Sequence, residues 1–166
     1  AVQARPMAEL PDKLSAVAAA AAVFAELHVP YALIGGLAVG IRSGVPRATL
    51  DVDFAVHTSS NRDALCARLA EHKFRETGRF PHSINFKHES GEPVQLALDV
   101  AFDAMIERAE LVQLGELQLR VVTKDDLIAM KRRAAADPRR RRSKALRDQA
   151  DIALLEGDVP DENEGW

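Results

Sequence analysis

The segment from Tyr31 to Val56 limits the fold more than any other part of the chain. It opens with a short apolar run that ends at Gly35 and Gly36, a pattern typical of a buried strand that enters a tight turn. Its last part alternates apolar side chains with Asp51 and Asp53, which predicts a second strand with two carboxylates on one face. The chain is therefore expected to build a sheet in which a glycine turn and a carboxylate pair are close in sequence.

The rest of the chain alternates helical and strand-like patterns. Apolar spacing predicts helices over 11–27, 37–42, 61–71, 103–110, 124–136 and 139–156, and strands over 74–77, 84–88, 94–100, 111–114 and 117–122. Asn61 is expected to cap one helix, and Thr123 with Asp126 another. The expected fold class is α/β (α+β), with a mixed, mostly antiparallel sheet flanked by helices and two C-terminal helices.

The length of 166 residues fits a single domain. We expect one domain over 1–166, with a catalytic sheet core at about 28–122, a helical extension over 123–156 and an acidic tail over 157–166. The lone Cys66 forms no internal disulfide, which favours a reducing, cytoplasmic setting. An apolar run over 16–25 is too short to cross about 30 Å of hydrocarbon, so no membrane partner is expected.

Charge is concentrated near the C-terminus, although the net charge of the whole chain is only -3. Between Lys131 and Arg147 nine basic residues face one acid, Asp137, a local net charge of nine minus one, or plus eight. From Asp148 onward every charged residue is acidic. Two interpretations stay open: a solvated basic face covered by the acidic tail, or a surface that binds phosphate.

The glycine pair and the aspartate pair together point to phosphate chemistry. Gly35 and Gly36 let the backbone approach a ligand closely, and the helix after them directs free N–H groups at an anion. Asp51 and Asp53 would repel each other unless a divalent cation lay between them, and hard oxygen ligands suit Mg²⁺. A third carboxylate on a neighbouring strand, for which Asp99 is the candidate, would complete a site for two Mg²⁺ ions.

Other chemistries find less support. The five histidines show no HExxH or Cys-His spacing for zinc, and no hydrolase triad can be assigned. One tyrosine and one tryptophan give little basis for an aromatic platform that binds single strands.

These motifs resemble the nucleotidyltransferase superfamily of DNA polymerase beta type. Within it the chain is most similar to AbiEii and MenA-like toxins and to aminoglycoside and lincosamide nucleotidyltransferases. The resemblance rests on Gly35-Gly36, Gly36-Leu37-Ala38, Arg47-Ala48-Thr49-Leu50-Asp51, Asp51-Val52-Asp53, Asp99, Asp125-Asp126 with Lys131, and Arg147-Asp148-Gln149-Ala150-Asp151.

The resemblance implies a role for each matched residue. Asp51, Asp53 and Asp99 would be the catalytic, metal-binding carboxylates, with Asp99 holding one metal or taking the proton of the acceptor. Nucleotide binding would involve Gly35, Gly36, Arg47, Thr49, Lys131 and Asp148. For each of these a structural role remains open: a plain tight turn for the glycines, ordering of the turn for Thr49, and an exposed charge or a Lys144–Asp148 pair within one helix for the C-terminal residues.

The implied activity transfers a nucleoside monophosphate from NTP, ATP among them, to an acceptor hydroxyl and releases pyrophosphate. RNA such as tRNA is slightly favoured as acceptor, and the protein would then be a toxin with an antitoxin partner. The alternatives are an antibiotic nucleotidyltransferase with a small-molecule acceptor, a catalytically silent module of the same fold, and a basic nucleic-acid-binding protein without chemistry.

Overall fold

A seven-stranded mixed sheet forms the centre of the molecule, in the order β3-β4-β5-β2-β1-β7-β6. The computed structural model describes residues 4–46 and 51–159. The strands are β1 (Tyr31–Ile34), β2 (Val52–Val56), β3 (Phe74–Phe80), β4 (Ser83–His88), β5 (Pro93–Ala97), β6 (Glu110–Leu114) and β7 (Leu117–Val121). Only the β1–β7 and β2–β5 pairs are parallel, and the other pairs are antiparallel. The predicted α/β class with a mostly antiparallel sheet is confirmed.

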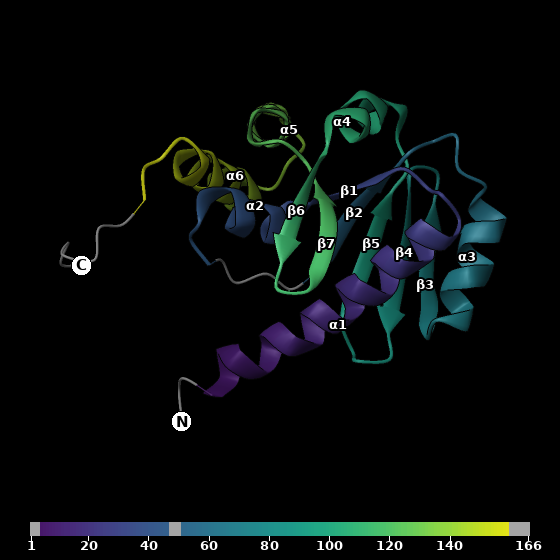
Figure 1. Ribbon diagram of the computed structural model, residues 1–166. Coiled ribbons are helices and arrows are strands. Elements are labelled where there is room, and N and C mark those ends of the chain that lie inside the picture. Colours follow the sequence, from purple (N-terminus) through teal and green to yellow (C-terminus); the bar gives the residue numbers. More distant parts are fainter. Residues whose placement is uncertain (1–3, 47–50, 160–166) are drawn as a thin grey trace.

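The helices lie in two groups around this sheet (Figure 1). They are α1 (Ala4–Glu26), α2 (Gly35–Ser43), α3 (Arg62–Glu71), α4 (Asp103–Arg108), α5 (Lys124–Ala136) and α6 (Arg142–Leu155), with a 3-10 turn η1 (Val100–Phe102). Helix α1 crosses one face of the sheet and packs against α3, whereas α2, α5 and α6 pack together beyond β1 and β7. Within the described parts of the chain, no helix has the length and apolar character needed to span a membrane.

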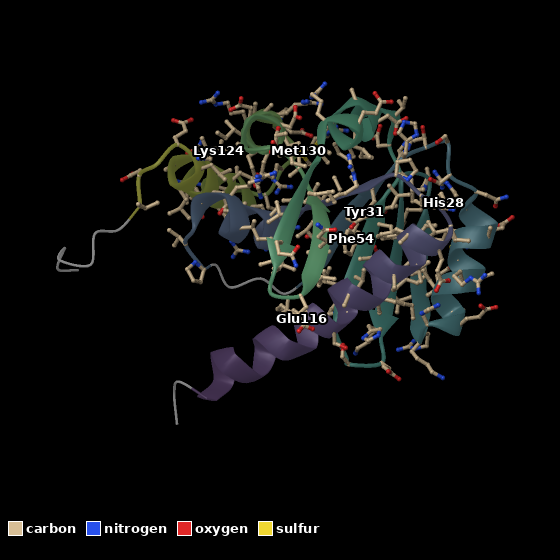
Figure 2. The ribbon with its side chains drawn as sticks, in the orientation of Figure 1. His28, Tyr31, Phe54, Glu116, Lys124 and Met130 are labelled. Carbon is tan, nitrogen blue, oxygen red and sulfur yellow. The ribbon has the colours of Figure 1, made fainter. Side chains whose placement is uncertain are left out.

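The core lies between α1 and the central strands. The rings of Phe24, Tyr31 and Phe54 meet there, with centroids 4.7 to 5.7 Å apart, and Figure 2 shows Tyr31 and Phe54 side by side at α1. On β4 and β5 the side chains Ile84, Phe86, Val94 and Leu96 are buried on the same face. Because successive side chains of a strand point to opposite faces, the remaining side chains of β4 and β5 point away from this core.

Several expected boundaries are corrected by the structure. Helix α1 begins at Ala4 and not near Pro11. A proline inside a helix removes one backbone hydrogen bond, but the helix can continue past it. The last helix begins at Arg142 and not at Arg139. Both predicted caps are confirmed, since Asn61 accepts from the amide of Ala64 and Thr123 from that of Asp126.

Strand β5 ends at Ala97, three residues before the expected end at Val100. The cause is the length of its partner, because β4 begins at Ser83 and Ser83 pairs with Ala97. Beyond this point the chain turns into η1, with the Asp99 side chain accepting a hydrogen bond from the amide of Ala101. Asp99 is therefore the cap of a short helical turn and not a strand residue.

Candidate active site

The centre of the candidate site is the junction of β1 and α2, where Gly35 lies against Asp53. Ile34, the last residue of β1, pairs with Asp53 of β2, and α2 begins at the next residue. Gly35 has φ 73°, in the left-handed region that favours glycine. A Cβ at this position would overlap the Asp53 carboxylate and lie 3.0 Å from its Cγ. Glycine thus permits both the turn and the close approach of the carboxylate.

The first turn of α2 has the properties of an anion site. Ile34 precedes the helix without a side-chain cap, and the first turn contains no acidic residue. Free N–H groups and the positive end of the helix dipole favour a bound phosphate at such a terminus. Gly36 is buried in this turn. The predicted phosphate-binding role of the two glycines is compatible with this geometry.

Arg42 fixes the other end of α2. Its Nε donates to the carbonyl of Val122 at 2.9 Å, and its Nη2 donates to the carbonyl of Val121 at 3.2 Å and to Glu110 Oε1 at 2.9 Å. These bonds tie the last turn of α2 to the end of β7 and to β6. Arg42, which belongs to none of the motifs in the sequence, thus anchors the helix that follows the glycine turn.

Asp51 and Asp53 have the donor chemistry for Mg²⁺. Asp51 directly precedes β2 and is exposed, and Asp53 is half-buried beside Gly35. Mg²⁺ is commonly held by one or two carboxylates together with substrate phosphates. The two aspartates and the adjoining anion site fit that arrangement. Over residues 4–46 and 51–159, however, no group of three His, Cys, Asp or Glu side chains is placed to hold a metal ion.

The expected third carboxylate is not brought to this pair. In the parallel register of β2 and β5, the residue opposite Asp53 is Gln95. Asp99 lies four residues further along, two residues beyond the end of β5 at the start of η1. A glutamine therefore occupies the position level with Asp53 on the neighbouring strand, and the role of Asp99 as third carboxylate of a two-metal site stays a prediction.

Arg47 and Thr49, which were assigned to nucleotide binding, lie outside the described residues. Their roles stay predictions.

The structure brings Lys131 and Asp148 to each other. Lys131 Nζ lies 3.4 Å from Asp148 Oδ1 and 3.1 Å from Asp151 Oδ2, and Arg140 Nε donates to Asp148 Oδ2 at 2.6 Å. Asp148 and Asp151 are 2% and 1% exposed. Two buried carboxylates of α6 are thereby held by cations of α5 and of the turn after it. Asp148 pairs between helices and not with Lys144, so this ion-pair cluster locks α5 against α6.

The basic stretch divides into paired and unpaired residues. Arg132 pairs with Glu156 and Arg139 with Asp137, beside the pairs of Lys131 and Arg140. Within the described chain, five exposed residues form no ion pair: Arg133, Arg141, Arg142, Lys144 and Arg147. Helix α6 therefore starts with exposed positive charge at the helix end that itself favours anions.

The comparison with protein families decides the identity. The family model described as "Nucleotidyl transferase AbiEii toxin, Type IV TA system" matches residues 17–164, nearly the whole chain. The chain belongs to the AbiEii family of nucleotidyltransferases. No curated protein matches the sequence significantly.

Solved structures with the same fold agree with this assignment of the AbiEii chain. A lincomycin-bound lincosamide antibiotic adenylyltransferase, LnuA, has a TM-score of 0.59 at 14% identity, over 82% of this chain and 91% of its own. ANT(2")-Ia in complex with adenylyl-2"-tobramycin has a TM-score of 0.58 at 18% identity, over 84% and 86%. An antigenic nucleotidyltransferase-like protein from Paracoccidioides brasiliensis has 0.60 at 21%, over 92% and 79%. These likenesses establish the nucleotidyltransferase fold.

Two residues of this AbiEii chain belong to none of the motifs in its sequence: Arg42 and Gln95. Gln95 could have been found, because the alternation of Val94 and Leu96 places it on the face opposite the apolar side chains. Arg42 carries no such local signal, since its hydrogen-bond partners are 68 or more residues away in sequence.

Proposed function

We propose that the protein is a Mg²⁺-dependent nucleotidyltransferase that moves a nucleoside monophosphate from NTP to an acceptor hydroxyl and releases pyrophosphate. The observation that carries this proposal is the contact between Gly35 and Asp53. It puts a half-buried carboxylate directly beside an uncapped helix terminus, and these are the two charges that a metal-bound triphosphate needs at one place.

Each part of the site has a task in this reaction. The N–H groups at Gly35 and Gly36 bind the triphosphate, while Asp51 and Asp53 hold Mg²⁺, which neutralises phosphate charge. The acceptor oxygen forms a bond to the α-phosphorus as the bond from that phosphorus to the β-phosphate oxygen breaks. Pyrophosphate leaves with the bonding electrons, and the hydroxyl proton is released to solvent. Catalysis then rests on positioning and charge neutralisation.

Lys131 and Asp148 take part indirectly in this proposal. The ion-pair cluster of α5 and α6 adjoins α2, because α6 packs against α2. It supports the helix whose first turn binds phosphate. Direct contact of Lys131 or Asp148 with nucleotide stays a prediction.

RNA is the acceptor that the charge distribution favours. Phosphate contacts come mainly from Lys and Arg, and five such side chains are exposed and unpaired from Arg133 to Arg147. The family description further supports a toxin of a toxin-antitoxin pair, with an antitoxin as partner. A small-molecule acceptor is the second candidate, since LnuA and ANT(2")-Ia, with the same fold, were solved with lincomycin and adenylyl-2"-tobramycin.

The test is a transfer assay with Mg²⁺ and each α-labelled NTP, offered pooled tRNA, lincomycin, tobramycin or bulk protein. Label should move with the unmutated protein and not with Asp53→Asn. Asp63→Asn is the matched control, because Asp63 is an exposed aspartate in the first turn of α3. Transfer that survives Asp53→Asn would contradict the proposal.

A further inference from the structure

One face of the sheet beside Asp53 carries no helix-facing apolar side chains and is open over β3, β4 and β5. Its members follow from the register, since residues directly opposite each other share a face. They are Arg75, Gly78, Phe80, Ser83, Asn85, Lys87, Pro93, Gln95 and Ala97. We call this set the open sheet face. The buried residues Ile84, Phe86, Val94 and Leu96 point the other way, into the core beneath α1 and α3.

A row of polar groups leads across this face from the candidate site. Asp53 is opposite Gln95 on β5, Gln95 is opposite Asn85 on β4, and Asn85 is opposite Gly78 on β3. Gln95 is exposed, whereas the Asn85 Oδ1 atom is buried and lacks a hydrogen-bond partner among the described residues. The row thus offers two amide groups on the strands next to the metal-binding carboxylates.

Phe80 places an aromatic ring at the end of the same face. It is 52% exposed, and no other aromatic side chain in the described chain is among the exposed large hydrophobic residues. The ring lies close to the backbone of the strand, because a Cβ at Gly78 would lie 3.1 Å from Phe80 Cε2 and 3.8 Å from Asn85 Nδ2. The glycine therefore allows the ring to lie over the strand, next to Asn85, with part of its surface in solvent.

The charge of the face disfavours one class of acceptor. Arg75 and Lys87 are exposed on it, and none of its described members is acidic. A polycationic aminoglycoside would meet two positive charges there, whereas a polyanion would be attracted. An exposed ring beside amide groups, flanked by cations, is the chemistry that binds a stacked base and its phosphate.

We propose that the open sheet face binds the single-stranded end of an RNA acceptor, with a base stacked on Phe80, amide contacts from Asn85 and Gln95, and phosphates near Lys87 and Arg75. This inference rests on the proposed transferase function and names the acceptor of that same site. The RNA hydroxyl is thereby presented to Asp53 along the row of amides. The nucleotide itself is bound at the Gly35 turn, on the other side of Asp53.

Binding and transfer are measured separately so that the two proposals can fail independently. The binding probe is a short fluorescein-labelled single-stranded RNA of mixed sequence, followed by fluorescence anisotropy with tobramycin as competitor. Phe80→Ala should weaken RNA binding about tenfold, and Phe80→Trp should restore it. Lys87→Gln should reduce the slope of log affinity against log salt by about one. NTP affinity should be unchanged in all three.

The matched controls lie on distant elements. Leu111→Ala removes an exposed hydrophobic side chain of β6, and Lys124→Gln removes an exposed lysine at the start of α5, labelled in Figure 2. Neither should change RNA affinity by as much as twofold. Circular dichroism melts of every variant verify that the fold is intact.

Each outcome separates the two proposals. The inference is overturned if the unmutated protein does not bind the RNA. It is also overturned if Phe80→Ala and Lys87→Gln bind the RNA as well as the unmutated protein does. Label transferred to tobramycin or lincomycin and not to RNA also overturns it while the transferase function stands. If RNA binds with the expected dependence on Phe80 and Lys87 but no label moves to any acceptor, the binding face stands and the proposed transferase function fails.

Discussion

Gln95 lies directly opposite Asp53 on the neighbouring parallel strand. The position beside Asp53 on this strand thus carries an amide and not a carboxylate. A neutral oxygen donor attracts a divalent cation less than a carboxylate does. In the proposed reaction, Asp51 and Asp53 would therefore bind Mg²⁺ with help mainly from the phosphates of the nucleotide.

The substitution Gln95→Asp is expected to raise Mg²⁺ affinity. It adds a charged oxygen ligand beside Asp53, so the Mg²⁺ concentration for half-maximal NTP binding should fall about tenfold, measured by calorimetric titration. Gln118→Asp on β7 is the control, because it adds the same charge to an exposed strand position away from Asp53. An equal effect of both variants would contradict a local metal site.

Gly35→Ala is expected to abolish nucleotide transfer. The new methyl group overlaps the Asp53 carboxylate and sits on a residue with φ 73°, so both the turn and the aspartate must move. Gly44→Ala separates the two causes, because Gly44 has φ 75° but open space around its Cβ. Both variants should lose about 1 kcal/mol of unfolding free energy. Only Gly35→Ala should lose NTP and Mg²⁺ binding, and retained binding would refute the close fit.

Lys131→Met is expected to destabilise the protein by about 3 kcal/mol, because it leaves two buried carboxylates with one fewer cation. Denaturant unfolding measures the loss. Arg133→Met, on the same helix, removes an exposed and unpaired charge and should change stability by less than about 0.5 kcal/mol. A loss of NTP affinity in Lys131→Met without any loss of stability would instead assign Lys131 to direct contact with the nucleotide.

Asp126 gives a prediction about pH. Two hydrogen bonds from the Arg108 guanidinium, at 2.8 and 2.9 Å, lower the pKa of Asp126 below its ordinary value, and a bond from the Thr123 hydroxyl adds to this. A lowered pKa in the folded state stabilises the fold above the unfolded pKa of about 4 and less so as pH falls below it. Asp126→Asn should therefore cost about 1 kcal/mol at pH 7, with the difference from the unmutated protein shrinking below about pH 4. Thermal melts across this range measure it, and a difference that grows in acid would have the wrong sign.

The parts of the fold that were predictable depend on local patterns. The alternation around Asp51 and Asp53 gives the face of β2, and the caps at Asn61 and Thr123 are formed within three residues. Their signal is in the sequence because each contact is made between close neighbours along the chain.

The misplacement of Asp99 has a non-local cause. Its flanking apolar residues extend the alternating pattern of β5 to Val100, so the sequence alone favours a longer strand. The end of β5 is set by Ser83, fifteen residues earlier than Leu98, where the partner strand begins. Similarly, the charges of Lys131 and Asp148 are visible in the sequence, but their pairing depends on how α5 turns back onto α6. Both features belong to tertiary structure, which single-sequence periodicity does not contain.

Helix α2 has one more property. Its first turn is the proposed binding site of the nucleotide, its last turn is tied by Arg42 to β7, and its side packs on α6. Thermodynamic reciprocity then requires that whatever shifts α6 and thereby α2 changes NTP affinity, and that NTP changes the affinity for that second ligand by the same factor. A protein bound to the outer surface of α6 thus has an energetic route to the active site that involves no contact with the nucleotide.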